Sequence, residues 1–368
     1  MRAVPPALVL TLPALAQAPF APLRLDDGWG VVTPAEAGVD GPRLQAALAA
    51  LMDGRLNVHA ALLVRHGKLV AEAYRRGADK PQTAWFTRTV AFGPSTAHDT
   101  RSVGKSVIAL LLGVAEAEGK LGSLDAPAIA WFPELRDLDT PERRRLTLRH
   151  LLTMSGGFEW HESGVGFPND EDRLAWKGDP ARFVLSRPFV AEPGTRFEYC
   201  SGATWVLAEV LRRATGQPWT DYAQARLFGP LGIRSATWTT DLRGRPMPNS
   251  GLRLTPRDMA RLAALLLARG RWQGKALVPG PWIDQMMRPG LPTGFEGTRY
   301  GGQCWTGTVS WGDRDRPWAA AFGNGGQRIY VVPELDLGII FTAGAYGHLP
   351  TARALQRAFE GLVGCVRP

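Results

Sequence analysis

The sequence places a serine and a lysine one helical turn apart at the start of an apolar segment. Ser102 and Lys105 stand in Ser-Val-Gly-Lys, and the apolar residues 107–114 follow, which predicts a buried helix from Ser102 to about Glu118. Of the six lysines, only Lys105 has a serine three positions earlier. A lysine in a buried helix is unfavourable unless its charge is paired or tuned. The fold must therefore give Lys105 polar partners, and a serine beside a base can become a nucleophile.

The first eighteen residues have the pattern of an export signal. Arg2 supplies a positive charge, residues 7–12 form a short apolar segment, and residues 14–16 offer small side chains for cleavage. We expect a signal peptide over residues 1–18 and hence a periplasmic or secreted protein. A misassigned start or a disordered leader is the alternative. No stretch of 18 apolar residues occurs, so no integral membrane segment is expected.

The net charge bears on the possible binding partners, and the cysteine content bears on disulfide bonds. The formal net charge is +9, from 43 basic and 34 acidic residues. The arginines are interspersed with acids, as in residues 140–145, which favours a solvated surface and no nucleic-acid partner. Cys200, Cys304 and Cys365 are an odd number, so free thiols are expected, with Cys200 as a small buried residue. No feature of the sequence indicates an oligomeric state.

Strand patterns lie near both ends of the chain, and helical patterns dominate between them. Residues 61–75 predict two strands that turn at His66, and residues 327–344 predict a second hairpin. Residues 77–100 are expected to form a loop. Helices are predicted over residues 102–118, 148–154, 202–214, 256–268 and 351–362.

This order of elements predicts an α/β chain of the α+β kind. The sheet is expected to come from about residues 19–80 and 295–368, so that both ends of the chain contribute strands to it. A helical subdomain is expected as an insertion over about residues 115–290. Together these parts would form one domain over residues 19–368.

A tyrosine followed by a serine is the second candidate for chemistry. Tyr199 and Ser201 stand in Phe-Glu-Tyr-Cys-Ser, and no other tyrosine has a serine or an asparagine two positions later. A tyrosinate beside a protonated lysine can act as a general base, because the ammonium group lowers the pKa of the phenol. The alternative is a core tyrosine at the edge of a strand or helix.

A glycine-rich turn is the third candidate. Gly323-Asn-Gly-Gly-Gln directly precedes an apolar strand. Glycines there let a substrate lie close to the strand edge, and a backbone N–H can donate to an oxyanion. The turn does not match a dinucleotide-binding or P-loop pattern. No metal-ligand cluster and no cofactor motif is evident, so neither a metal nor a cofactor is implied.

These three motifs, in this order and with these spacings, resemble the serine β-lactamase and penicillin-binding-protein superfamily, in which Ser-x-x-Lys is a signature. The likeness is closest to the tyrosine-type branch, which includes class C β-lactamases, D-alanyl-D-alanine carboxypeptidases, esterases and 6-aminohexanoate-dimer hydrolases. Residues 146–157, 191–199, 227–233 and 251–261 also look like this family. The resemblance implies an antiparallel sheet flanked by terminal helices, plus an inserted all-helical subdomain.

The resemblance implies a role for each motif residue. Ser102 would be the acylated nucleophile, Lys105 would keep the proton network charged, and Tyr199 would be the base in acylation and help activate water afterwards. Backbone N–H groups of Ser102 and Gln327 would form the oxyanion hole. The implied substrate-binding residues are Ser201, which stands where the family often has Asn within reach of Lys105, and Asn324, Gly325, Gly326 and Trp160.

One departure from the family pattern bears on the substrate. Asn324-Gly-Gly stands where the family has Lys-Thr-Gly or His-x-Gly, and in members that bind penicillins a cation there helps to hold the substrate carboxylate. Asn324 has no charge, and no Ser-Asp-Asn motif is present. We therefore expect a small-molecule ester or amide as substrate. The alternatives are a weak β-lactamase or D-alanyl-D-alanine carboxypeptidase, and a catalytically silent ligand-binding module of the penicillin-binding-protein type.

Other residues are given lesser roles. Trp160, His161 and Glu162 follow a Ser-Gly turn and either line the pocket or form a plain surface turn. His66 and His98 are expected to be solvent-exposed or locally hydrogen-bonded rather than catalytic. Trp305 and Trp311 are candidates for contact with an apolar substrate. No Gly-x-Ser-x-Gly elbow occurs, which argues against an α/β-hydrolase.

Overall fold

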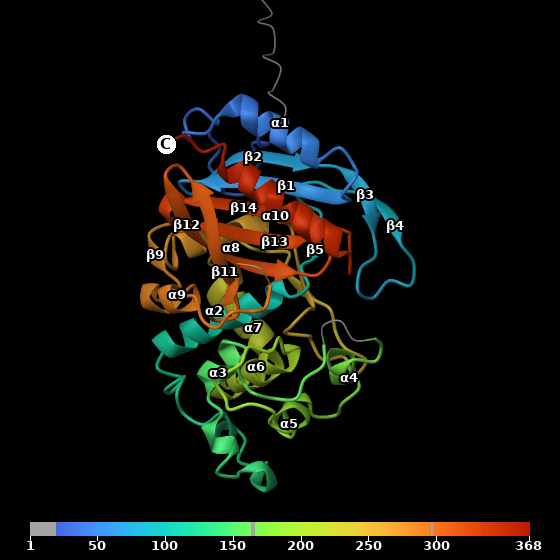
Figure 1. The fold of residues 1–368 in the computed structure, drawn as a ribbon, viewed down its shortest axis with the longest axis vertical. Coiled ribbons are helices and arrows are strands. Elements are labelled where there is room, and N and C mark those ends of the chain that lie inside the picture. Colours follow the sequence, from blue (N-terminus) through green and yellow to red (C-terminus); the bar gives the residue numbers. More distant parts are fainter. Residues whose placement is uncertain (1–19, 163–165, 296) are drawn as a thin grey trace, which may run out of the picture.

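The computed structural model describes residues 20–162, 166–295 and 297–368. An antiparallel sheet forms one end of the molecule, and helices gather at the other end (Figure 1). The sheet has seven strands, which are, in spatial order, β10 (Arg299–Tyr300), β11 (Trp305–Trp311), β12 (Arg314–Gly323), β13 (Gln327–Val332), β14 (Leu337–Ala343), β1 (Val58–Arg65) and β2 (Lys68–Tyr74). Because β14 pairs with β1, the two ends of the chain are joined in one sheet.

The remaining elements are helices and short strand pairs. The α-helices are α1 (Gly41–Leu51), α2 (Val103–Ala117), α3 (Leu148–Leu152), α4 (Asp170–Leu174), α5 (Pro180–Leu185), α6 (Ser201–Thr215), α7 (Trp219–Ala223), α8 (Pro256–Leu267), α9 (Gly280–Met286) and α10 (Leu349–Val363). Small sheets are made by β3 (Arg76–Asp79) with β4 (Arg88–Ala91), by β5 (His98–Asp99), β7 (Leu252–Leu254) and β6 (Thr237–Trp238), and by β8 (Arg271–Trp272) with β9 (Lys275–Ala276). Single turns of 3₁₀-helix are η1 (Ala128–Trp131), η2 (Arg136–Leu138), η3 (Arg143–Arg145) and η5 (Pro333–Leu335), and η4 (Gln224–Phe228) is a π-helical turn.

Helices cover both faces of the large sheet, and this explains the unbroken apolar strands. The side chains of β1 alternate between two cores. Leu62 and Val64 pack in the core that contains α2 and α8, whereas Ala61 and Leu63 pack with the terminal helices α1 and α10. A strand buried on both faces needs apolar residues at every position rather than at every second one.

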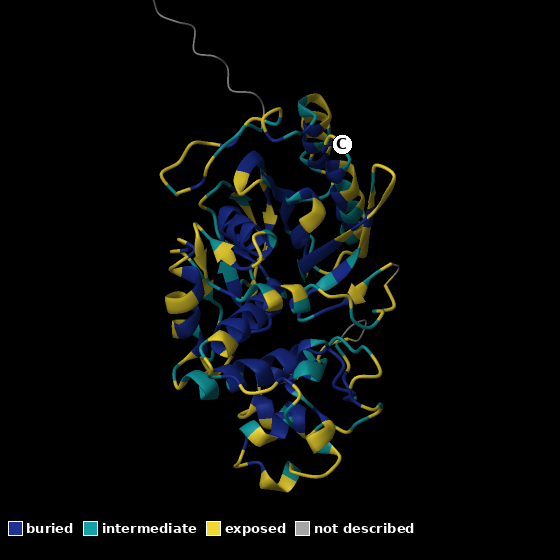
Figure 2. Cartoon of the chain, turned by 90° about the vertical axis from the view of Figure 1, so that its left-hand side faces the viewer, coloured by how far each residue is buried: buried dark blue, intermediate teal, exposed yellow. Residues whose placement is uncertain are grey.

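Helix α2 connects the sheet to the helical end. It packs against β12 and β13 on one side and against α6 on the other, and it is buried from Val103 to Ala115. Figure 2, in which buried residues are dark blue, shows the buried interior extending through both ends of the molecule. The N-terminus of α2, with Ser102, therefore lies at the junction of the two parts.

The structure confirms the α+β fold class, the two strands that turn at His66, the C-terminal hairpin and each predicted helix. Helix α8 falls within the range expected for the helical insertion, but it packs on the sheet through β14, β13 and β1. The loop expected over residues 77–100 is wrong in part, because β3, β4 and β5 form there. Helix α1 was not predicted, although Asp40 is its N-cap and a proline follows at its start.

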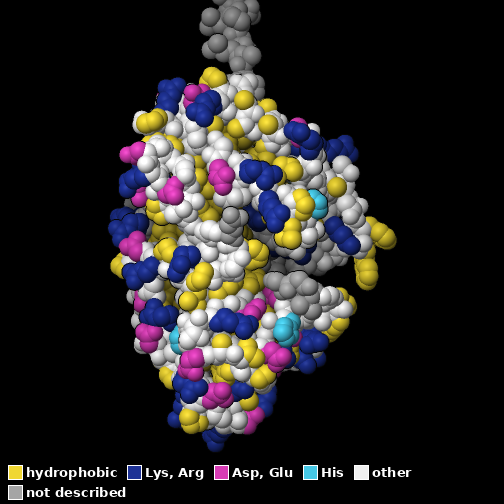
Figure 3. All heavy atoms as spheres, in the orientation of Figure 1, with side chains coloured by type: hydrophobic (Ala, Val, Ile, Leu, Met, Phe, Trp, Pro, Cys, Tyr) yellow, Lys and Arg dark blue, Asp and Glu magenta, His cyan; other side chains and the backbone are white. Residues whose placement is uncertain are grey.

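The surface and the N-terminal segment bear on the expectations about partners. The signal-peptide prediction for residues 1–18 lies outside the described residues. Within the described residues, no helix is both long and apolar enough to cross a bilayer. On the face shown in Figure 3, basic and acidic side chains are interspersed, and hydrophobic side chains project from the tip of the β3–β4 hairpin, where Trp85 and Phe86 are exposed.

A glycine in α2 permits the close contact between α2 and α9. A Cβ atom on Gly113 would lie 2.5 Å from the indole ring of Trp282, which is fixed by its bond to the Ala109 carbonyl. We expect Gly113→Ala to destabilise the fold by about 1–3 kcal/mol through overpacking, although alanine is the better helix former. Gly361→Ala in α10 is the control, because open space surrounds that position, and it should stabilise by up to about 1 kcal/mol. Urea unfolding of both variants measures this, and a Gly113→Ala protein as stable as the wild type would contradict the packing argument.

Candidate active site

Ser102 lies where the chain turns from β5 into α2. Thr100 is tied to β7, because its N–H and its hydroxyl donate to the Leu252 carbonyl over 2.9 and 2.8 Å. Arg101 has a φ of +53°, a left-handed conformation that a residue other than glycine adopts only when its surroundings hold it. The turn presents the partly exposed Ser102 at the N-terminus of a long helix, where the helix dipole favours negative charge.

Lys105 is buried and points back along α2 to the serine. Its Nζ atom donates to Ser102 Oγ over 3.0 Å and to the carbonyl oxygen of Asn249 over 3.3 Å. The same atom lies 4.9 Å from the centre of the Tyr199 ring. With 1% of the residue exposed, the ammonium group depends on these contacts in place of water. The structure thus brings Ser102, Lys105 and Tyr199 together, as the sequence motifs required.

Tyr199 is partly exposed, and its phenol is under opposing influences. Burial raises its pKa, whereas the positive charge of Lys105 and the hydroxyl of Ser102 lower it, and the net pKa is raised. Its ring packs against aromatic rings of the sheet, with 5.8 Å between the ring centres of Tyr199 and Trp305 and 6.1 Å to Tyr300. The phenol is therefore fixed in direction beside the serine and the lysine.

Two carboxyl groups close the site on the side of the helical part. Glu162 belongs to the segment 160–162 that was a candidate for lining the pocket, whereas Glu171 was not predicted. Glu162 Oε2 accepts from the Ser201 N–H over 2.7 Å and from Trp160 Nε1 over 2.9 Å. The Ser201 hydroxyl lies 2.7 Å from Glu162 Oε1 and 3.2 Å from Glu171 Oε1. Glu171 also accepts from the side-chain amide of Asn249 over 2.6 Å. No recognisable spacing links these positions, since they meet only in the folded chain.

The acidic pair sets the charge around the lysine. Burial raises the pKa of Glu162 to about 7, helped by the neighbouring charge of Glu171 and opposed by Lys105. Burial lowers the pKa of Lys105, but the charges of Tyr199, Glu162 and Glu171 outweigh it, so that the pKa of the lysine is raised. Lys105 is therefore an ammonium group at neutral pH.

The end of β12 lies against the turn that carries the nucleophile. A Cβ atom on Gly323 would lie 2.1 Å from the carbonyl oxygen of Thr100, so only glycine allows this approach. Gly325 and Gly326 follow with φ values of +92° and +103°, which turn the chain tightly into β13. The glycine-rich motif is therefore part of the same site as Ser102, as its sequence pattern suggested.

The two polar residues of this turn differ in access to solvent. Asn324 is exposed, and its Oδ1 accepts from the Gly347 N–H over 2.7 Å. Gln327 is completely buried, and its side-chain amide donates to the Ala343 carbonyl over 2.6 Å. A residue with no exposed surface cannot offer its N–H to a substrate, whereas Asn324 stands next to the strand end that meets the nucleophile turn.

Some expected neighbours have different surroundings. Trp160 is buried, so the surface-turn interpretation is wrong, and its indole N–H orients Glu162. The hydroxyl of Ser201 is directed to the two glutamates, and its link to Lys105 runs through their charge rather than through a direct bond. Trp311 does not join this group of rings, since its N–H is bonded to the Val366 carbonyl at the C-terminus. All three cysteines are free and buried, as expected.

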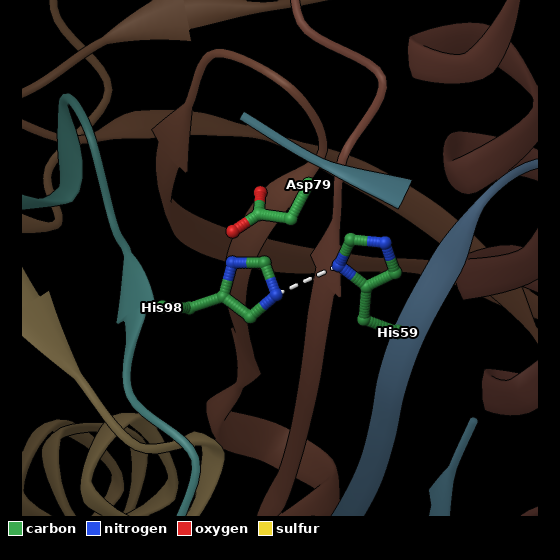
Figure 4. A group of neighbouring side chains, drawn as sticks. All are labelled: His59, Asp79 and His98. Carbon is green, nitrogen blue, oxygen red and sulfur yellow. Dashed lines mark hydrogen bonds between the residues drawn. The ribbon is translucent and has the colours of Figure 1, made fainter. Parts of the chain in front are cut away.

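A second polar cluster lies outside this site. The side chains of His59, Asp79 and His98 offer donor atoms within 4.8 Å of one another, the spacing of a metal centre (Figure 4). The two imidazoles are bonded to each other, 2.8 Å from His59 Nδ1 to His98 Nε2, and Asp79 accepts from the Tyr346 hydroxyl. This bonding favours a hydrogen-bonded cluster that joins β1, β3 and β5. His98 is thus wholly buried, so of the two alternatives expected for it the structure shows hydrogen bonding and not exposure to solvent.

Comparisons with known proteins show which family and which folds this chain resembles. The Beta-lactamase family model matches residues 44–360. The 6-aminohexanoate-dimer hydrolase of Paenarthrobacter ureafaciens is 28% identical over 336 residues, which are 84% of this chain and 78% of that protein. Esterase EstB of Burkholderia gladioli is 31% identical over 216 residues, 55% of this chain and 53% of that protein. The solved structure of EstCE1, a hydrolase with promiscuous acyltransferase activity, has a TM-score of 0.67 at 17% identity, covering 88% of this chain and 98% of that one.

The histidine cluster predicts how stability depends on pH. Burial lowers the pKa of His59 to about 4 and that of His98 well below its usual value. Below about pH 6.5 the unfolded chain takes up protons that the folded chain refuses, so stability should fall towards pH 4 by up to about 1.4 kcal/mol per pH unit for each histidine. His59→Gln should flatten this acid limb in urea unfolding at pH 5 and pH 7. His66→Gln, at an exposed position, is the control and should leave the limb unchanged.

Proposed function

The chain belongs to the Beta-lactamase family, and we propose that it is a serine hydrolase that cleaves an ester or amide bond through an acyl-enzyme on Ser102. One observation carries this proposal. The buried ammonium of Lys105 donates to the Ser102 hydroxyl over 3.0 Å while it lies against the ring of Tyr199. A module that only binds a ligand has no need for a nucleophile, a cation and a phenol in such contact.

Acyl transfer would use the three groups in sequence. Lys105 lowers the free energy of the phenolate form of Tyr199, and the phenolate takes the proton of Ser102 as Oγ attacks the carbonyl carbon. The phenol then gives that proton to the departing alcohol or amine, and the acyl group stays on Ser102. A water molecule repeats the exchange in deacylation, with Tyr199 again as base. The acid leaves, and Ser102 recovers its proton.

The oxyanion hole needs two donors beside Oγ. The N–H of Ser102 at the helix N-terminus is one of them. The backbone N–H of Gln327 is not a suitable second donor, because this residue is completely buried. We assign the second donor to the backbone N–H of Asn324. Asn324 is exposed and follows Gly323, whose close approach to Thr100 brings the strand end beside the serine.

The surroundings of the serine favour an uncharged, apolar acyl or leaving group. Asn324 offers no cation, and the nearby Arg328 is occupied, because it is buried and donates to the carbonyls of Gly323 and Gln327. Trp305 lies beside Tyr199 and also packs against the half-exposed Phe295. The relatives described as a hydrolase of the 6-aminohexanoate dimer and as an esterase support this substrate class.

Export is a further part of the proposal. It rests on residues 1–18, whose charged, apolar and small-residue segments follow one another as in a cleaved signal peptide. The substrate would then be met in the periplasm or outside the cell.

The first test addresses Ser102 and Tyr199. Treatment with a fluorophosphonate should add one adduct to the wild-type protein and none to Ser102→Ala, by intact-protein mass. Tyr199→Phe should lower kcat/KM for a p-nitrophenyl ester by about 10²–10⁴-fold, because it removes the general base. A folded wild type that takes no adduct would favour the silent binding module. A Tyr199→Phe enzyme whose kcat/KM is within twofold of the wild-type value would exclude Tyr199 as the general base.

A second test addresses the missing cation. We expect the wild type to hydrolyse p-nitrophenyl esters well and penicillins poorly. Asn324→Lys should raise kcat/KM for a penicillin about tenfold over Asn324→Gln, the scale of one charge-assisted hydrogen bond to the substrate carboxylate. Asn324→Gln is the matched control because it also loses the bond to Gly347. A wild type as efficient on penicillins as on esters would contradict the assignment.

A further inference from the structure

The acidic pair beside Ser201 has contacts that cannot all be satisfied when both carboxyls are ionised. Oε2 of Glu162 accepts two N–H groups, from Ser201 and from Trp160. Oε1 of Glu162 and Oε1 of Glu171 both face the single hydroxyl of Ser201, at 2.7 and 3.2 Å. A serine hydroxyl has one hydrogen to donate. With both carboxyls ionised, one of these short oxygen contacts would have no proton.

A proton on Glu162 satisfies every contact. Because Oε2 is the acceptor of two N–H groups, the proton belongs on Oε1, where it can be donated to Ser201 Oγ. Ser201 then donates its own hydrogen to Glu171, whose Oε1 also accepts from Asn249. Both short oxygen contacts of Ser201 then have a hydrogen between their atoms, and the pair carries one negative charge.

The chain of contacts continues to the nucleophile. Asn249 donates from its side chain to Glu171, and its carbonyl oxygen accepts from Lys105. The indole N–H of Trp205 donates to Oδ1 of the same Asn249 amide group over 2.9 Å. Lys105 in turn donates to Ser102. The charge of the acidic pair is therefore held in a fixed position relative to the ammonium group.

We propose that Glu162 is a positioning residue that holds a proton on the acid side of neutral pH, so that the Glu162–Glu171 pair presents a single negative charge to Lys105 and Tyr199 there, gains a second charge as the pH rises, and thereby sets the pH dependence of acyl transfer. The proposal rests on the proposed serine hydrolase function. The pKa of Glu162, raised by burial to about 7, agrees with the contacts. The titratable groups that interact with Glu162 come from several elements and are Glu171, Lys105, Tyr199, Cys200 and Tyr300.

The effect on catalysis follows from charge. The negative charge of Glu162 raises the pKa of both Tyr199 and Lys105. When Glu162 loses its proton, the phenolate of Tyr199 becomes harder to form. Acylation by a phenolate base becomes faster as the pH rises, and in the wild type this increase should be smaller above about pH 7 than in an enzyme with a neutral side chain at position 162.

Spectroscopy tests the proton independently of catalysis. Infrared difference spectra of the full-length wild type against Glu162→Gln at pH 6 should show the C=O band of one protonated carboxylic acid, which disappears at pH 8.5. Glu159→Gln, at an exposed position on the same segment, is the control and should leave the band in place. If no protonated carboxyl is lost in Glu162→Gln at pH 6, the proposal is wrong, whether or not the protein is a hydrolase.

Kinetics tests the influence of the proton on the site. With a p-nitrophenyl ester, the ratio of kcat/KM at pH 8.5 to that at pH 6 should be about three- to tenfold higher in Glu162→Gln than in wild type, because the amide never gains the negative charge that disfavours the phenolate of Tyr199. In Glu171→Gln the bend in the profile should move below pH 7, because Glu162 loses its like-charged neighbour. Parallel profiles for the wild type and both variants would show a merely structural role and overturn the proposal. If the protein takes the fluorophosphonate adduct but turns over no ester, the infrared difference spectra alone decide whether Glu162 holds the proton.

Discussion

The buried ammonium of Lys105 is the constraint on which the rest of this molecule depends. Water cannot reach it, so the fold must supply both hydrogen-bond acceptors and negative charge. Ser102 supplies one acceptor and the peptide of Asn249 the other, while Tyr199, Glu162 and Glu171 contribute negative charge whenever they are ionised. These groups come from α2, from the segment before β7 and from the helical part, so the cation cannot be satisfied until all three are in place.

The sheet positions the other half of the site by backbone contact. Strand β12 ends at Gly323 against Thr100, and the pairing of β14 with β1 connects that end of the sheet to the N-terminal half of the chain. Helix α2 then needs apolar neighbours on every side, which the sheet and α6 provide together. The site therefore lies at the junction because only there can one helix be buried by both parts while Ser102 at its N-cap remains partly exposed.

Local patterns account for what the sequence could predict. Apolar runs, caps and glycine stops locate the long helices and the hairpins, and the Ser-x-x-Lys spacing places Ser102 and Lys105 on one helix face. The sequences of strands β3 and β4 show no clear alternation of apolar and polar residues, since each strand is four residues long and pairs only with the other. The sequence placed Glu162 in a segment that could line the pocket, but its pairing with Glu171 could not be predicted, because that pairing arises from proximity to Ser201 across the fold. The complete burial of Gln327 was not evident either, since a glutamine does not indicate that it lies in the interior.

The replacement of asparagine by serine after the tyrosine has a consequence for charge. An asparagine amide can contact a lysine directly and is neutral, whereas the shorter Ser201 is surrounded by two carboxyl groups. If both carboxyls and the phenol were ionised, three negative charges would face one ammonium in a partly buried site, and the phenolate that attacks the serine proton would be the most disfavoured of the three. One retained proton brings the acidic pair to a single charge, which is enough to keep Lys105 protonated without suppressing the base. The identity of residue 201 and the protonation of Glu162 are thus two parts of one electrostatic balance.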